Sequence, residues 1–309
     1  MFVIGGESKT GRPSTDDEPR GLGSDGSGGS WEEAPPTICL RDGVPAGTLP
    51  LPLEREVVEV WRIEVSEANL GWAQAADCLS PEEVGRAARY RFAADRDRFV
   101  LGRSALRRRL AAGLRCAAGD VRIQYGAQGR PELESGSNPA GVVFSVSHIP
   151  GLVLLAFARG CRLGIDVETV DRVRDWRSFA RLALSEREYA AVASLPAGLQ
   201  AAGFLRAWTA KEAYLKATGR GLTVELGRIE AEVDPARPAR LLKAYEGDGE
   251  PADWKLRSIA VGRGAGGDAG VGAGGRLGGD DPRGVAAVTC LLSAACGGMV
   301  ERRSPAPTP

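Results

Sequence analysis

The chain has 309 residues, which is enough for one large domain or two modest ones with a substantial core. Its formal net charge is +0, which argues against a general polyanion binder such as a nucleic-acid-binding protein. No apolar stretch approaches the roughly 18 residues of a membrane-spanning helix, and no secretion signal is present at the start. The six cysteines form no C-x-x-C pair and only one histidine occurs, so no Cys/His zinc site is expected. We expect a reduced, cytoplasmic location.

The N-terminal residues have the composition of a segment that does not fold by itself. Gly, Ser, Pro, Asp and Glu dominate, and such a sequence cannot bury enough apolar surface to offset the entropy of ordering. We therefore predict a disordered N-terminal extension over residues 1–54. Order should begin with a first strand at Val57–Ile63, which is rich in β-branched residues.

Two arginine-rich helices are predicted next. Ser80 is typical of an N-cap, Pro81 of the first helical position and Glu83 of a capping box, so one helix should cover residues 81–90. A second should cover residues 95–109. A basic helical face is usually just solvated, but guanidinium groups also suit phosphate. The arginines of these helices are Arg86, Arg89, Arg91, Arg96, Arg98, Arg103 and Arg107–Arg109.

The rest of the chain alternates strands and helices. Strands are predicted at residues 121–125, 144–148, 151–158, 163–168, 224–233, 239–245, 255–261 and 285–292, and helices at 176–184, from 185 and from 199. This order predicts an α+β protein with two similar α/β lobes, an N-terminal lobe at 55–160 and a C-terminal lobe at 161–296. The Gly-rich run at 262–284 is expected to be a flexible loop, and residues 297–309 a tail.

Two carboxylates lie close together on one predicted strand. Asp166 and Glu168 are two residues apart, so their side chains point to the same face. Neighbouring carboxylates repel each other unless a proton or a cation lies between them. An isolated pair of this kind is usually a solvent-facing strand edge. A third carboxylate, Glu212, would complete a hard-oxygen ligand set suited to Mg²⁺ or Mn²⁺.

Glu212 belongs to the segment Trp208–Leu222, which should be helical until Gly219 ends it. Lys216 is four residues further on and shares the same helical face, which is the ordinary spacing of a surface ion pair. The alternative is a phosphate ligand, because substrate phosphates often complete the coordination of Mg²⁺. Groups that could contact such a phosphate are Lys211, Lys216, Arg86, Arg98, Arg130 in a Gly-rich turn, and His148, whose competing role is a structural hydrogen bond.

Other catalytic chemistries lack their residues. His148 is the only base available for a Ser or Cys triad, and no G-x-S-x-G elbow occurs. No G-x-x-x-x-G-K-[ST] motif occurs either, which excludes a P-loop nucleotidase. Metal-assisted chemistry on a phosphate is the hypothesis that the residues favour.

Three segments stand in an order that is specific when taken together. They are Phe144-Ser145-Val146-Ser147-His148, Leu163-Gly164-Ile165-Asp166-Val167-Glu168 and Trp208–Leu222, with weaker support from Gly129-Arg130-Pro131. The second and third match a G-[IV]-D-[IV]-E strand followed by a W-x-x-K-E-[AS]-x-x-K helix. With these motifs the chain resembles the Sfp-type 4'-phosphopantetheinyl transferases over about residues 55–294.

The resemblance implies two similar lobes related by pseudo-two-fold symmetry, with coenzyme A in the cleft between them. It implies transfer of the 4'-phosphopantetheine arm of coenzyme A to a serine of an acyl or peptidyl carrier protein, with release of adenosine 3',5'-bisphosphate. In that reaction Asp166, Glu168 and Glu212 match the metal ligands, Glu212 also matches the base, and Lys216 matches the lysine near the transferred phosphate. The expected contacts to coenzyme A are Arg86, Arg130, Ser147, His148, Lys211 and Lys216.

Two other functions stay open at this point. The chain could be a carrier-protein or coenzyme A binding module without catalysis, or another Mg²⁺-dependent phosphoryl-transfer enzyme. Glu83 stands where some relatives have a basic phosphate contact, so binding of the 3'-phosphate would rest more on Arg86 and His148. The pathway of the carrier protein does not follow from these residues, and the resemblance implies a monomer.

Overall fold

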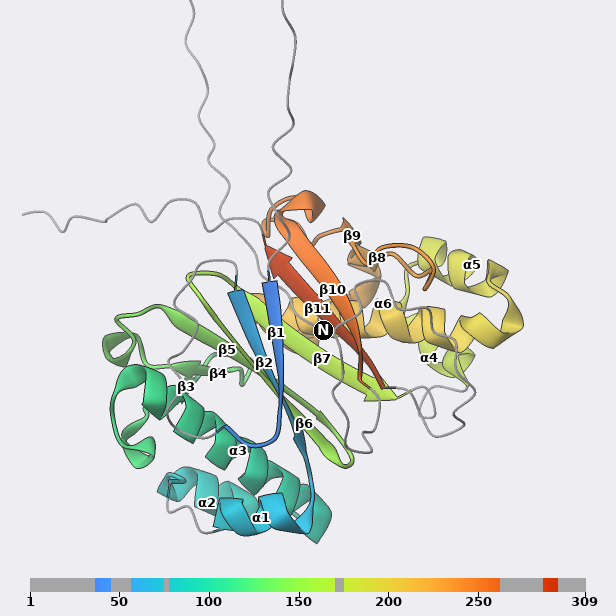
Figure 1. Ribbon diagram of the computed structural model, residues 1–309. Coiled ribbons are helices and arrows are strands. Elements are labelled where there is room, and N and C mark those ends of the chain that lie inside the picture. Colours follow the sequence, from blue (N-terminus) through green and yellow to red (C-terminus); the bar gives the residue numbers. More distant parts are fainter. Residues whose placement is uncertain (1–36, 46–56, 75–77, 170–174, 262–285, 294–309) are drawn as a thin grey trace, which may run out of the picture.

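The computed structural model describes residues 37–45, 57–74, 78–169, 175–261 and 286–293. The glycine-rich loop predicted at 262–284, the tail at 297–309 and most of the extension at 1–54 lie outside these residues. Within them the chain forms two main sheets and two groups of helices, which lie toward opposite ends of the molecule (Figure 1). The predicted α+β class is confirmed.

The first sheet has four strands in the order β1-β2-β6-β5. They are β1 (Thr37–Asp42), β2 (Val57–Glu64), β5 (Val142–Ile149) and β6 (Leu152–Arg159). β1 runs parallel to β2, and the other neighbours are antiparallel. The prediction of disorder throughout residues 1–54 is therefore wrong for β1. This short segment is ordered by hydrogen bonds to β2, which a local argument from composition does not include.

Three helices belong to the same half of the chain: α1 (Glu67–Gln74), α2 (Pro81–Ala88) and α3 (Ala93–Leu114). α2 begins as predicted, because Ser80 and Glu83 form a reciprocal capping box. α3 buries an apolar stripe in a cluster that includes side chains of β2, β5 and β6. The small sheet of β3 (Ile123–Tyr125) and β4 (Pro131–Leu133) lies between α3 and β5 in the chain.

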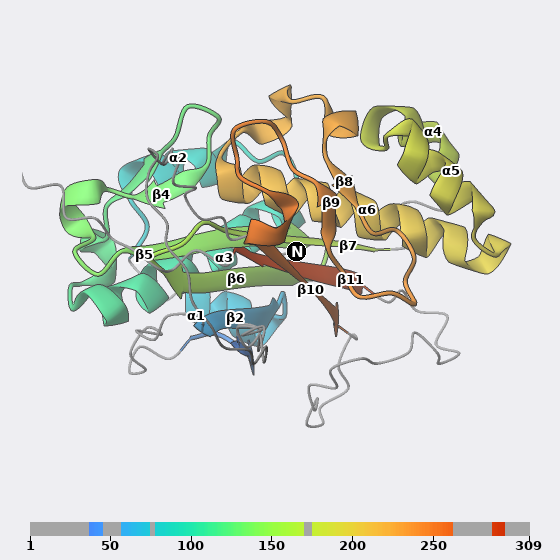
Figure 2. The ribbon, with the colours of Figure 1, turned by 90° about the horizontal axis from the view of Figure 1, so that it is seen from above.

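The second sheet has the order β10-β11-β7, with both pairs antiparallel. Its strands are β7 (Leu163–Thr169), β10 (Trp254–Val261) and β11 (Ala286–Ser293). The helices of this half are α4 (Trp176–Ala183), α5 (Glu186–Ser194) and α6 (Ala197–Thr218). α6 lies along the sheet against β7 and β11 (Figure 2).

One predicted strand is largely replaced by other structure. Residues 224–233 contain a 3₁₀ turn at Leu226–Arg228 and only a two-residue strand, β8 (Glu230–Ala231). β8 pairs with β9 (Leu241–Lys243). Of the β-branched residues in this segment, Val224 and Ile229 pack into an apolar cluster with α6, and Val233 packs into a second cluster that contains side chains of α4 and α6.

The two main sheets meet where β5 and β7 run side by side. In the described residues no backbone ladder joins these strands. Instead the backbone N–H of Ile165 donates to Ser145 Oγ at 2.9 Å, and that of Val167 donates to Ser147 Oγ at 3.2 Å. One apolar cluster continues across this joint, with side chains from β2, β5, β6 and β7. Among the described helices, none combines the length and apolar character that a bilayer crossing requires.

Candidate active site

Three polar side chains meet where β5, β7 and α6 come together. Ser147 Oγ donates to Asp166 Oδ1 at 2.9 Å. Lys216 Nζ lies 2.7 Å from the same carboxylate oxygen, 3.0 Å from Ser147 Oγ and 3.0 Å from the carbonyl oxygen of Ile165. Asp166 and Ser147 are buried, and the Lys216 side chain is 30% exposed. The structure thus gathers three of the predicted site residues, which the sequence places in three separate segments.

Gly164 allows α6 to lie this close to β7. A β-carbon built on Gly164 would lie 2.1 Å from the carbonyl oxygen of Ala213 and 2.8 Å from the backbone nitrogen of Ala217. Both distances are shorter than any ordinary contact, so no other residue fits here without moving the helix. The glycine therefore sets the distance between the strand that carries Asp166 and the helix that carries Lys216.

Glu212 lies one turn before Lys216 on α6. Its Oε1 is buried and has no hydrogen-bond partner among the described residues. Burial raises the pKa of Glu212 to about 7, with a further contribution from the negative charges of Asp166 and Glu168, while the charge of Lys216 opposes the rise. A carboxyl group in these surroundings is stabilised either by a proton or by a nearby cation.

The chemistry of Asp166, Glu168 and Glu212 fits a hard divalent cation. All three supply oxygen, and a cation would relieve the repulsion that raises the pKa of Glu212. In the part of the chain that the structure describes, no three His, Cys, Asp or Glu side chains are already gathered as a metal site. The ammonium group of Lys216 pairs with Asp166 at 2.7 Å instead. Side-chain rotation is therefore required before all three carboxylates can hold one ion.

His148 follows Ser147 on β5. Desolvation lowers the pKa of His148, and the positive charges of Arg98 and Lys216 lower it further. A neutral imidazole near two cationic side chains is suited to an anion, whose charge would raise that pKa again. Arg98 lies on α3 and also pairs with Asp95 at 2.6 Å. The sequence analysis offers Arg98 as a possible phosphate contact, and its electrostatic effect on the pKa of His148 becomes evident only in the fold.

Arg86 and Arg130 make protein contacts. The guanidinium of Arg86 lies 5.2 Å from the centre of the Phe99 ring, and its side chain is exposed. Arg130 Nη1 donates to the carbonyl oxygen of Ala217 at 2.6 Å, and Nη2 donates to that of Leu163 at 3.2 Å. Arg130 therefore bridges the β3–β4 turn to the second half of the chain. A contact of either arginine with coenzyme A stays a prediction.

Lys211 lies away from this cluster despite its place next to Glu212. Its side chain is 0% exposed, and Nζ donates to the carbonyls of Ala183 at 2.6 Å and Leu226 at 3.0 Å and to the carboxylate of Glu188. All three donors of the ammonium group are thus occupied inside the protein. This corrects the expectation that Lys211 contacts coenzyme A, because neighbours on a helix point about 100° apart. We assign Lys211 a structural role.

Comparisons with known proteins agree with this geometry. A model of the 4'-phosphopantetheinyl transferase superfamily matches residues 162–270, and one of the N-terminal region of 4'-phosphopantetheinyl transferases matches residues 61–159. The 4'-phosphopantetheinyl transferase HetI of Nostoc sp. is 37% identical over 215 residues, which are 70% of this chain and 85% of that protein. The chain belongs to the 4'-phosphopantetheinyl transferase family. It is an enzyme of that class, and the family's reaction is phosphopantetheinyl transfer from coenzyme A to carrier proteins.

More distant members of the family are also similar to this chain. The L-aminoadipate-semialdehyde dehydrogenase-phosphopantetheinyl transferase of Xenopus laevis is 28% identical over 205 residues, 62% of this chain and 67% of that protein. The human protein of the same name is 28% identical over 172 residues, 53% of this chain and 56% of that protein. The relatives of this chain therefore include proteins of a Nostoc species and of vertebrates.

Proposed function

We propose that this enzyme transfers the 4'-phosphopantetheine arm of coenzyme A to a serine hydroxyl of an acyl or peptidyl carrier protein and releases adenosine 3',5'-bisphosphate. The observation that supports it best is the meeting of Ser147, Asp166 and Lys216 beside the buried carboxyl group of Glu212. This arrangement offers a cation, hydrogen-bond donors and a base at one point. Phosphoryl transfer depends mainly on such positioning and electrostatic stabilisation.

The reaction assigns one task to each group. The serine oxygen of the carrier attacks the β-phosphorus of coenzyme A, and the bond from that phosphorus to the bisphosphate breaks. Negative charge grows on the phosphate oxygens, and the ammonium group of Lys216 is placed to stabilise it. The proton of the serine hydroxyl passes to Glu212, directly or through one water molecule.

We propose that Asp166, Glu168 and Glu212 hold Mg²⁺, or Mn²⁺ in its place. The ion supplies Lewis-acid stabilisation of the diphosphate. With a cation held by these carboxylates, the ammonium group of Lys216, which now pairs with Asp166, would be able to contact the substrate phosphate. The oxygen ligand set and the repulsion among the carboxylates support this proposal.

Coenzyme A is proposed to lie between the halves of the chain, with residues 55–160 on one side and 161–296 on the other. Arg86, Arg130, Ser147, His148 and Lys216 are the proposed contacts. We propose a monomer that works in the cytoplasm. Cys39, Cys78, Cys116 and Cys161 form no disulfide, which agrees with a reducing compartment.

The deciding experiment is a transfer assay with purified full-length protein. Coenzyme A and Mg²⁺ are added with each of several apo carrier proteins of fatty-acid, polyketide and non-ribosomal peptide origin, and intact mass is measured. We expect the mass of the phosphopantetheine arm to appear on at least one carrier and to be lost with chelator. Glu212→Ala should lower the rate by about 100-fold or more, as expected for loss of a general base and a metal ligand.

The matched control is Glu246→Gln, because Glu246 is 86% exposed and pairs only with Arg228 among the interactions described. This variant should keep the full rate. A folded enzyme that modifies none of the carriers would overturn the proposal. Binding of coenzyme A without transfer would instead support a binding module, and hydrolysis of its diphosphate without an acceptor would support a different phosphoryl-transfer enzyme.

A further inference from the structure

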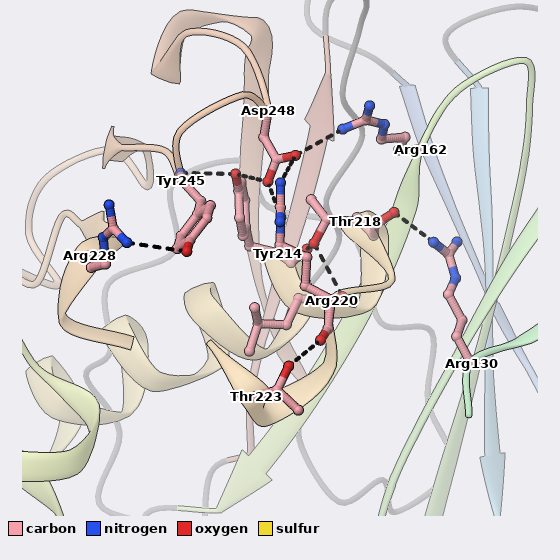
Figure 3. Close-up of polar contacts among 11 residues, drawn as sticks. Arg130, Arg162, Tyr214, Thr218, Arg220, Thr223, Arg228, Tyr245 and Asp248 are labelled. Atoms are coloured by element: carbon pink, nitrogen blue, oxygen red, sulfur yellow. Dashed lines mark hydrogen bonds and ion pairs between the residues drawn. The ribbon is translucent and has the colours of Figure 1, made fainter. Parts of the chain in front are cut away.

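A buried carboxylate lies near the C-terminal end of α6. Asp248 follows β9 in the chain and is 6% exposed. Its Oδ2 accepts hydrogen bonds from Tyr214 Oη and Arg220 Nε, each at 2.7 Å, and its Oδ1 accepts one from Arg220 Nη2 at 2.8 Å. Arg162 Nη1 lies 3.6 Å from Oδ1. Figure 3 shows Asp248 between these three side chains, which with it are called the Asp248 cluster.

The partners of Asp248 come from the two elements that build the proposed site. Tyr214 lies on α6 between Glu212 and Lys216, and Arg220 follows the left-handed Gly219 that ends the helix. Arg162 immediately precedes β7, the strand that carries Asp166. One carboxylate therefore ties the end of α6 to the start of β7.

The contacts of Asp248 with Tyr214 and Arg220 are strong ones, and its ion pair with Arg162 at 3.6 Å is looser. The pair of hydrogen bonds from Arg220 is bidentate, which fixes geometry as well as charge. Tyr214 is fully buried, and burial together with the hydrogen bond to Asp248 raises the pKa of Tyr214 well above its usual value. Its hydroxyl thus stays a donor to Asp248 and also accepts the backbone N–H of Tyr245 at 3.0 Å. Loss of the carboxylate would leave buried donors without an acceptor.

Arg130 holds the same two elements from the other half of the chain. Its guanidinium binds the carbonyl oxygens of Ala217 on α6 and Leu163 on β7. Figure 3 shows Arg130 and Asp248 approaching the end of α6 from different elements. The junction of α6 and β7 is thus held on both sides, and the carboxylate of Asp248 itself has no role in the proposed chemistry.

We infer that Asp248 is a positioning residue for phosphopantetheinyl transfer. By fixing the end of α6, its carboxylate holds Lys216 and Glu212 in register with Asp166 of β7. The inference rests on the proposed function of those three residues. Asp248 acts through the position of α6, because its side chain contacts none of these three residues. A displacement of about 1 Å at a reacting group can cost a factor of about 100 in rate, so the loss should appear in kcat.

The test compares Asp248→Asn and Tyr214→Phe with the control Glu246→Gln in the full-length enzyme. Asp248→Asn keeps the size of the side chain but removes its charge, and Tyr214→Phe removes a single donor. We expect Asp248→Asn to lower kcat by about 10- to 100-fold and Tyr214→Phe by about 10-fold, with KM for coenzyme A within about threefold of wild type. Asp248→Glu should recover part of the rate, because it restores the charge.

Hydrogen exchange provides a readout that does not depend on activity. In Asp248→Asn, amides of residues 209–218 should exchange faster, while those of α5 should exchange as in wild type. Glu246→Gln should change neither region. A folded Asp248→Asn enzyme with wild-type kcat would overturn the inference, as would faster exchange spread evenly over the protein.

Two further outcomes are also decisive. If Asp248→Asn does not fold, Tyr214→Phe decides by the same measurements, and an unchanged kcat in that variant overturns the inference. If the wild-type enzyme modifies no carrier, the proposed function fails, whereas the exchange rates of residues 209–218 still decide whether Asp248 holds α6. The two failures are therefore distinguishable.

Discussion

Glu212 is the residue whose ionisation should be visible in the stability of the protein. Its pKa is raised from 4.5 to about 7 in the folded state, so the native protein holds a proton that the unfolded chain has released. That contribution to stability is complete below pH 4.5 and is lost as the pH rises to about 7. Without metal, Glu212→Gln should therefore be more stable than wild type at pH 8, by about 1–3 kcal/mol, and nearly equal to it at pH 4.5.

Chemical denaturation at both pH values in the presence of chelator measures this difference. Mg²⁺ should stabilise the wild-type protein at pH 8 and have little effect on Glu212→Gln, since a ligand that binds only the native state adds to stability. The exposed Glu246→Gln variant is the control and should follow the wild-type curve. Equal pH dependence in Glu212→Gln and wild type would contradict the assignment.

At the residue scale, the sequence indicates which side chains have suitable chemistry better than it indicates where those side chains point in the fold. The motifs point to Asp166, Lys216 and Ser147, and the structure brings them within hydrogen-bonding distance. Lys211 resembles them in the sequence because it is basic and adjacent to Glu212. The three acceptors around its ammonium group, on Ala183, Glu188 and Leu226, come from other segments of the chain, so a local pattern does not indicate them.

Gly164 illustrates how one residue fixes the packing of two elements. Its missing side chain admits the backbone of α6 at Ala213, where a β-carbon would lie 2.1 Å from the carbonyl oxygen. Gly164→Ala should push α6 away from β7, lower the free energy of unfolding by about 3 kcal/mol and reduce transfer by about 100-fold. The loss of rate should exceed the loss of folded protein, because the helix carries Glu212 and Lys216.

A matched control for this variant exists in the same helix. Apart from its chain neighbours and the backbone of its own helix, a β-carbon on Gly198 would have no atom within 4 Å. Gly198→Ala should therefore stabilise the protein by up to about 1 kcal/mol through helix propensity, with full activity. Denaturation and the carrier assay are measured for both variants. Two variants with equal stability and equal rates would disprove the close-approach argument.

The elements themselves were predictable to the extent that their signals are local. The capping boxes at Ser80 and Ser185 mark the starts of α2 and α5 in the sequence and in the structure. β1 and the short helix α1 were missed. β1 gains its order from pairing with β2, and α1 has a weak apolar stripe and no basic residue in its last turn.

At the scale of the whole molecule, the two halves are less separate than a division at residue 160 suggests. One apolar cluster includes strands of both sheets, and β5 contacts β7 through serine hydroxyls. The sequence shows the buried character of both strands but not that they are neighbours, because their adjacency depends on the order of all the strands between them. A shared core predicts that both halves unfold together, in one transition.

Ser145 offers the means to test this coupling without altering the proposed catalytic groups. Its buried Oγ accepts the backbone N–H of Ile165 at 2.9 Å, so Ser145→Ala leaves a buried donor without its acceptor. We expect a loss of about 1–3 kcal/mol in the free energy of unfolding, with tryptophan fluorescence and far-ultraviolet circular dichroism changing together. Ser194→Ala is the control, because Ser194 is exposed and bonds only locally, and it should change stability by less than about 0.5 kcal/mol. If Ser145→Ala instead separated the transition into two steps, the halves would be independent folding units that dock, and the joint at β5 and β7 would be an interface between them.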